Sequence, residues 1–322
     1  MKVNRRWGAS ALAGCAGLTL VGCGATGVST SGPAGVMLQA ANQQALNSSF
    51  QVDFSSQLHV DLSGVTGLTG VSSRELSLVQ AEINSAGLTG TAQVQSQTQA
   101  EVTLSLPPLL SQPLHVIELN GAEYVSEDGT QWHVVGAGQS GLAGGLGSAA
   151  GGSLTNLRSE LRSWGQDLRN SATVTNLGNT EINGSQVDHL RTNLSGAAMS
   201  QVLSQVLSSV ASQLTSSAPA LSSELPLIEQ LLQFTEVKAD SYVLTSSGKL
   251  DRASLAVGLK LDLSTLSTLA PAGAGLPGGT ASLTYAGAAN FSAYGQNFNI
   301  QKPSQIVAGP LPTPSGLASA LS

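Results

Sequence analysis

Long stretches of this chain alternate between apolar and polar residues. In residues 50–62 the apolar residues, including Phe54 and Leu58, occupy the even positions, and polar residues occupy most of the odd ones. The same period of two runs through residues 91–106 and 249–263. Because successive side chains of a strand point to opposite faces of a sheet, this pattern predicts antiparallel strands with one apolar and one solvated face. Strands of this length predict a large and strongly curved sheet.

Shorter alternating segments are separated by residues typical of tight turns. Asn-Gly, Asp-Gly and similar pairs favour the backbone conformations that hairpin turns require. They predict a three-stranded meander over residues 114–135, two strands around Asn183-Gly184 in residues 172–194, and a hairpin that turns at Ser247-Gly248. Residues 280–300 predict a final pair of strands.

Three regions have the spacing of helices. Residues 36–47 predict a short helix, residues 153–168 a second one, and residues 194–232 a pair of helices. The first helix of that pair carries one apolar stripe, which consists of Met199, Leu203, Val206, Val210 and Leu214. Strands, then helices, then strands again, without a repeated β-α-β order, predict an α+β fold with helices on one face of an antiparallel sheet.

The N-terminus has the features of an export signal. Residues 1–6 carry three positive charges, and residues 7–21 are apolar or small and uncharged, which is too short for a membrane-spanning helix. Leu20-Val21-Gly22-Cys23 then matches the bacterial lipobox, whose cysteine receives a diacylglyceryl group. The sequence ending at Cys15 matches the same pattern, but it leaves a shorter hydrophobic region. We therefore expect residues 1–22 to be a lipoprotein signal peptide and Cys23 to be the lipidated residue.

The remaining chain divides simply by composition. Residues 23–35 are small and polar and predict a flexible tether. Residues 36–301 carry the strand and helix patterns and predict a single domain, and residues 302–322, which contain four prolines, predict a weakly ordered tail. Nothing after residue 22 approaches 18 consecutive apolar residues.

Charge and motif content narrow the function further. Without residues 1–22 the chain has 10 basic and 19 acidic side chains, an acidic balance with no basic patch for nucleic acid. A GxGxxG pattern in residues 136–141 lacks the buried parallel strand and the helix of a dinucleotide site. The four histidines have no metal-ligand spacing, and no GxSxG elbow is present. We expect no cofactor, no metal and no enzyme activity.

Small residues recur on the apolar faces of the predicted strands, among them Ala92, Ala100, Ala253, Gly287 and Ala289. They allow two interpretations that the pattern does not separate. Small side chains on a curved sheet leave room for an apolar guest, or they let helices pack closely in a dry core.

Taken together, the lipobox at residues 20–23 and three strand segments resemble the LppX/LprG lipoproteins of actinobacteria and, more distantly, the LolA/LolB lipoprotein carriers. The segments are residues 114–135, 182–203 and 240–263. The resemblance implies a curved antiparallel half-barrel, α-helices packed over its concave face, and a hydrophobic cavity for acyl chains. It also implies transport of lipids or lipoglycans in the cell envelope.

The sequence thus predicts a lipoprotein anchored to the extracytoplasmic face of the cell membrane that binds a lipid or acylated glycolipid, with or without a transporter partner. The residues expected to line its cavity are Met199, Leu203, Val206, Val210, Leu255 and Val257. An alternative is an envelope scaffold or partner-binding lipoprotein with the same fold. A surface hydrolase is a third possibility and requires serine, histidine and acidic side chains to converge.

Overall fold

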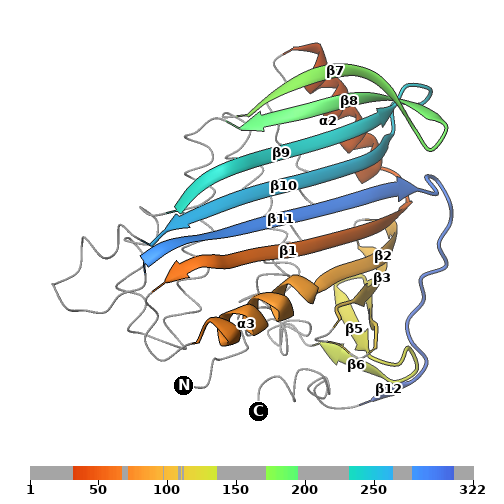
Figure 1. Cartoon of the computed structure of the whole chain (residues 1–322). Helices are drawn as coiled ribbons and strands as arrows, with labels where there is room; N and C mark the ends of the chain where they lie inside the picture. The colour runs from red at the N-terminus through yellow and green to blue at the C-terminus, as the bar shows by residue number, and fades with distance from the viewer. Residues whose placement is uncertain are drawn as a thin grey trace.

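The computed structural model describes residues 32–66, 72–96, 98–107, 110, 112–135, 172–194, 232–263 and 278–307. Within these residues the strands form one twelve-stranded sheet that does not close on itself (Figure 1). In chain order the strands are β1 (Phe50–Thr66), β2 (Gly87–Ser96), β3 (Gln99–Ser105), β4 (Leu114–Leu119), β5 (Ala122–Ser126), β6 (Trp132–Val135), β7 (Ala172–Ile182), β8 (Ser185–Leu194), β9 (Leu232–Leu244), β10 (Leu250–Asp262), β11 (Gly278–Ser292) and β12 (Ile306–Val307).

The sheet consists of two runs of consecutive strands joined in the middle. Its order is β12-β6-β5-β4-β3-β2-β1-β11-β10-β9-β8-β7, so β1 to β6 form one run and β7 to β11 the other. The long strands β1 and β11 pair antiparallel and connect the two runs. Only the short β12 is parallel to its neighbour, β6. The large antiparallel sheet predicted from the alternating pattern is confirmed, as are its Asn-Gly hairpins: Asn120, Gly121, Asn183 and Gly184 all have positive φ.

Two strand predictions were wrong. The alternation in residues 91–106 belongs to two strands, β2 and β3, with a tight turn between them. Because Val94 pairs with Ala100 and Ala92 with Val102, even-numbered residues face the same side in both strands, and the pattern continues through the turn.

The second correction concerns the final strand pair, which is the single strand β11. Ala293 and Gly295 have positive φ and turn the chain out of the sheet. The apolar residues beyond the turn, Phe298 and Ile300, pack against Ile117, Tyr124 and Trp132 instead. The backbone N–H of Phe298 donates to the Gln95 side chain (2.7 Å) and not to a neighbouring strand.

Helix α2 (Pro33–Leu46) confirms the predicted short helix. It begins three residues earlier than predicted because Pro33 stands at its first turn, where a missing N–H costs nothing. Leu38 and Ala41 of α2 pack in one core cluster with Phe54 of β1 and Ala253 of β10.

Helix α3 (Ser73–Ser85) was not predicted. Its sequence signal is the capping box in which Ser72 accepts from the Glu75 N–H and the Glu75 carboxylate accepts from the Ser72 N–H. β2 pairs with β1 only as far as Gln57. Beyond that point Asn84 of α3 exchanges two hydrogen bonds with the Val60 backbone (2.6 and 3.0 Å), which occupies the edge that β2 leaves free (Figure 1).

The end of the β1–β11 pair is closely packed. The register shifts between Asp61 and Gly64, and Gly64 then pairs with Thr280. Gly279 has a φ of +89°, and a Cβ built on it would overlap the carbonyl oxygen of Gly64. A Cβ on Gly64 would lie 2.6 Å from the carbonyl oxygen of Thr280. The two backbones can approach this closely only because both positions are glycine.

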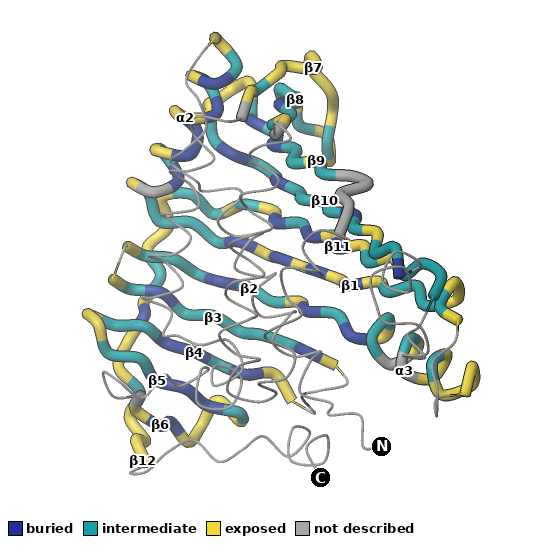
Figure 2. Tube along the Cα trace, turned by 90° about the vertical axis from the view of Figure 1, so that its left-hand side faces the viewer, coloured by how far each residue is buried: buried dark blue, intermediate teal, exposed yellow. Residues whose placement is uncertain are grey.

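Burial alternates along the long strands, as Figure 2 shows for β1. We call the side that carries Phe54 the apolar face and the opposite side the polar face. The main core cluster lies on the apolar face and includes Leu38 and Ala41 of α2, and the smaller cluster around Trp132 lies on the polar face. The predicted covering of the sheet by helices falls on residues 153–168 and 195–231, outside the described residues. The prediction was wrong at its end, because Leu232 begins β9.

Candidate functional site

The apolar face forms continuous rows across β1, β11, β10 and β9. Strand register places the side chains of each row next to one another. The three central rows are Phe54-Ala289-Ala253-Ser241, Ser56-Gly287-Leu255-Ala239 and Leu58-Tyr285-Val257-Val237. A further row begins with Val60, Leu283 and Leu259. This surface joins strands from both ends of the chain into one apolar site.

The first row is closed. Ala253 and Ala289 are 1% and 0% exposed and belong to the core cluster with Leu38 and Ala41 of α2. Their short side chains let the helix pack closely on the sheet. Of the two interpretations of the small residues, close packing is therefore the correct one at this row.

The next rows are mixed, because Leu58 and Tyr285 are buried whereas other side chains in them are not. Leu255, Val257, Leu283 and Val60 pack against the core cluster but remain only half-buried. Full burial of one such side chain contributes about 1.5–3 kcal/mol, so each retains part of that free energy for a further apolar contact. Leu255 and Val257 thus lie on the face that the sequence predicted. Their role as cavity-lining residues stays a prediction, and Cys23, Met199, Leu203, Val206 and Val210 lie outside the described residues.

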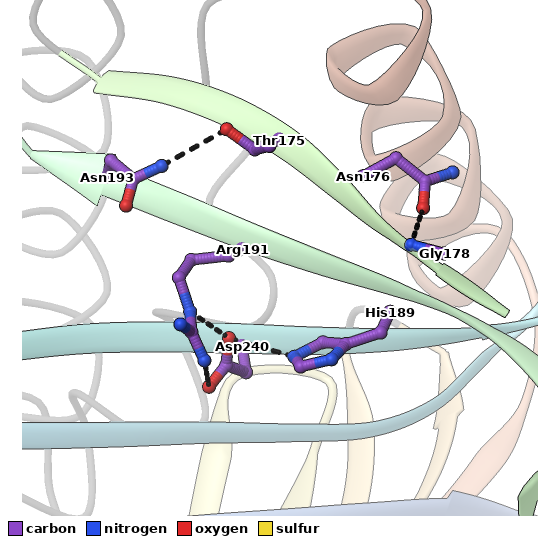
Figure 3. Close-up of polar contacts among 7 residues, drawn as sticks. All are labelled: Thr175, Asn176, Gly178, His189, Arg191, Asn193 and Asp240. Atoms are coloured by element: carbon purple, nitrogen blue, oxygen red, sulfur yellow. Dashed lines mark hydrogen bonds and ion pairs between the residues drawn. The ribbon is translucent and has the colours of Figure 1, made fainter. Parts of the chain in front are cut away.

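The polar face carries a charged cluster on β8 and β9, close to the sheet edge that β7 forms (Figure 3). Arg191 of β8 donates two hydrogen bonds to Asp240 of β9, through Nε at 2.8 Å and Nη2 at 3.1 Å. His189 Nε2 lies 3.0 Å from Asp240 Oδ1, and the His189 ring stacks on Tyr242 at 4.5 Å. Burial acts most strongly on Asp240 and opposes its ionisation, but hydrogen bonds from Arg191 and His189 outweigh it and lower its pKa.

We expect Asp240→Asn to lower the free energy of unfolding at pH 7 by roughly 1–3 kcal/mol, because it removes charge-assisted hydrogen bonds. The pKa of Asp240 is depressed in the folded protein, so its contribution is complete above the unfolded pKa of 3.8 and is lost as the pH falls through the folded pKa. Urea unfolding at several pH values measures the difference between variant and wild type, which should shrink below about pH 4.

Asp188→Asn is the matched control for that measurement, since Asp188 accepts only a 3.5 Å contact from Asn176. It should change stability little at any pH. An Asp240→Asn deficit that stays constant down to pH 2 would contradict the assignment.

The histidines do not gather into a catalytic or metal site within the described residues. His59, His115, His133 and His189 lie on β1, β4, β6 and β8, which are four different strands and none of them neighbours. In the described part of the chain no three His, Cys, Asp or Glu side chains form a metal-binding group. No helix in that part is long and apolar enough to cross a membrane.

Sequence reasoning missed two buried serines on this face, Ser241 in the first row and Ser56 in the second. Ser56 occupies an even position of β1, between Phe54 and Leu58, and its side chain is buried in the apolar face. For Ser56 the signal was present, because a serine interrupts an otherwise apolar series in residues 50–62.

No protein-family model matches the sequence, and no curated protein matches it. Among solved structures the chain is similar to the lipoprotein LppX of Mycobacterium tuberculosis, with 11% identity, a TM-score of 0.36, and coverage of 83% of this chain and 97% of LppX. It is also similar to LprF of Mycobacterium bovis, with 11% identity, a TM-score of 0.34, and coverage of 84% of this chain and 96% of LprF. A LolA superfamily protein of Nitrosomonas europaea has 10% identity and a TM-score of 0.22, with coverage of 82% of this chain and 93% of that protein.

LppX is described as a lipoprotein and the Nitrosomonas europaea protein as a LolA superfamily protein, the groups to which the resemblance in the sequence also pointed. Alignments at such TM-scores carry no inference about a ligand.

Proposed function

We propose that this protein is a cell-envelope lipoprotein, anchored through Cys23, that binds an acyl lipid against the apolar face of its sheet. The observation that carries the proposal is the group of apolar side chains on this face that stay half-buried, Leu255, Val257 and Leu283. Apolar surface of this extent, left partly uncovered on an exported protein, favours an apolar ligand.

Binding would be a partition from the membrane into the protein. Each buried CH₂ group contributes about 0.8 kcal/mol, so two long acyl chains provide a large driving force. The apolar stripe Met199, Leu203, Val206 and Val210 would cover the ligand from the side opposite the sheet. Displacement of that covering segment would then release the lipid.

The protein would carry out no chemistry on the ligand and would use no cofactor and no nucleic-acid partner. The protein would act at the extracytoplasmic face of the cell membrane, where its own anchor holds it near the lipid source. An envelope scaffold without a ligand is the competing function.

Organic extraction of the purified protein, followed by mass spectrometry, tests the proposal. The full chain carrying Cys23→Ser is purified without detergent, and we expect lipid to co-purify with it. Val257→Asp should reduce the bound lipid at least about tenfold, because it places a carboxylate beside Tyr285 and Val237 on the apolar face.

Ala256→Asp is the matched control. Ala256 precedes Val257 but faces the polar side, directly opposite Lys238, so the new carboxylate gains an opposite charge. Its lipid content should equal that of the wild type, and circular dichroism checks the fold of both variants. A wild-type protein without co-purifying lipid would leave the scaffold function standing.

A further inference from the structure

Ser56 is a buried hydroxyl on an apolar surface. Its side chain is 5% exposed, and its neighbours along β1 on the same face, Phe54 and Leu58, are 4% and 6% exposed. In the part of the chain that the structure describes, Ser56 Oγ has no hydrogen-bond partner. The residues opposite it, Gly287 of β11 and Leu88 of β2, have no polar side-chain atoms.

Such a hydroxyl costs stability in the protein alone. A buried polar group without a partner loses its hydrogen bonds to water, at about 1–3 kcal/mol, whereas an alanine at the same place carries no such penalty. In the described sheet no residue forms a hydrogen bond with Ser56 Oγ that would offset this penalty. Its position therefore suits a hydrogen bond to a bound ligand.

A second buried group of the same kind lies on the helix that packs on this face. Asn42 of α2 is 4% exposed, and its Oδ1 also has no partner among the described residues. Leu38 and Ala41 of the same helix belong to the core cluster that contains Phe54 and Leu58. The sheet and the helix thus each place a buried polar atom without a described partner in this core.

We propose that Ser56 Oγ donates a hydrogen bond to the ester carbonyl oxygen of a bound acyl lipid. The inference rests on the proposed function and names the polar contact and the lipid class for the same site. Ser56 and Leu255 lie in one row, two strands and about 10 Å apart. An acyl chain that covers Leu255 and Val257 can end with its carbonyl at Ser56, since that oxygen is the first polar atom after the chain.

Competition between two lipids in one sample tests this contact. The full chain carrying Cys23→Ser is incubated with vesicles that contain equal amounts of dioleoylphosphatidylglycerol and its dialkyl ether analogue, which lacks the carbonyls. Mass spectrometry then measures the ratio of the two lipids on the re-isolated protein. We expect a five- to tenfold enrichment of the ester lipid, about the effect of one hydrogen bond.

Ser56→Ala should bind both lipids without preference. Its thermal unfolding midpoint, measured without lipid, should equal or exceed that of the wild type, because the variant removes an unpaired buried hydroxyl. A merely structural role for Ser56 would lower the midpoint and leave the ratio unchanged.

Ser126→Ala is the control for loss of a buried hydroxyl. Ser126 is also fully buried, but its Oγ donates to Asp128 at 2.9 Å. This variant should lose stability and keep the ester preference.

Three results would overturn the proposal. If Ser56→Ala kept the ester preference, the Ser56 contact would be wrong, but the proposed lipid binding would still hold. If the protein preferentially bound oleic acid added to the same vesicles, the group that accepts from Ser56 Oγ would be a free carboxylate and not an ester carbonyl. Failure of the wild type to take up either lipid would remove the proposed function itself.

Discussion

Gly279→Ala is expected to lower the free energy of unfolding by about 3 kcal/mol or more. The backbone of Gly279 has a φ of +89°, which strains any residue with a Cβ, and the added methyl group would overlap the carbonyl oxygen of Gly64. That oxygen is part of the backbone of β1 and cannot rotate away as a side chain can. The strands must therefore separate at this end of the β1–β11 pair.

Gly278→Ala provides a control one residue away. A Cβ at Gly278 would meet only Thr66 Oγ1, at an ordinary contact distance of 3.6 Å. Urea denaturation of both variants measures the difference, and Gly278→Ala should lie within about 1 kcal/mol of the wild type. Equal stabilities for the two variants would mean that the close approach of Gly64 and Gly279 is not a feature of the folded protein.

The second large effect concerns location. Cys23→Ser is expected to move the protein from the membrane fraction to the soluble fraction of the envelope, because serine has no thiol to receive the diacylglyceryl group. Cell fractionation with immunoblotting measures the change, and metabolic labelling with a radioactive fatty acid measures the lipid itself. Loss of the label should accompany loss of membrane association.

Cys15→Ser separates the two lipobox candidates. If residues 1–22 are removed as the signal peptide, Cys15 leaves with them, and the variant should be labelled and membrane-bound like the wild type. Release by Cys15→Ser together with retention by Cys23→Ser would reverse the assignment.

Local pattern was sufficient to predict much of the sheet. Residues 50–62 and 249–263 alternate because β1 and β10 each have one face on the core, and both strands lie where the pattern places them. Turn residues located the hairpins, since Asn183-Gly184 adopts the positive φ values that few other pairs tolerate. Periodicity alone could not detect the turn between β2 and β3, because side-chain parity is unchanged across it.

Contacts between distant segments were beyond sequence reasoning. The pairing of β1 with β11 has no local signal, and it determines which residues share a row with Phe54 or Ser56. The ion pair of Arg191 with Asp240 joins residues 49 positions apart through strand register. Leu255 and Val257 could be assigned to the apolar face from alternation, whereas the degree of their burial depends on contacts with other segments that alternation does not show.

The central pairing of β1 with β11 also bears on how the chain folds. Ser49 Oγ donates to the carbonyl oxygen of Gln296, and the two residues are 247 positions apart. Contacts of such high sequence separation close only after a large loss of chain entropy, which slows folding. Until β11 has been synthesised, β1 keeps one unpaired edge along its length, and the half-formed sheet is open to aggregation. The two runs of strands can therefore join into one sheet only after β11 has been synthesised.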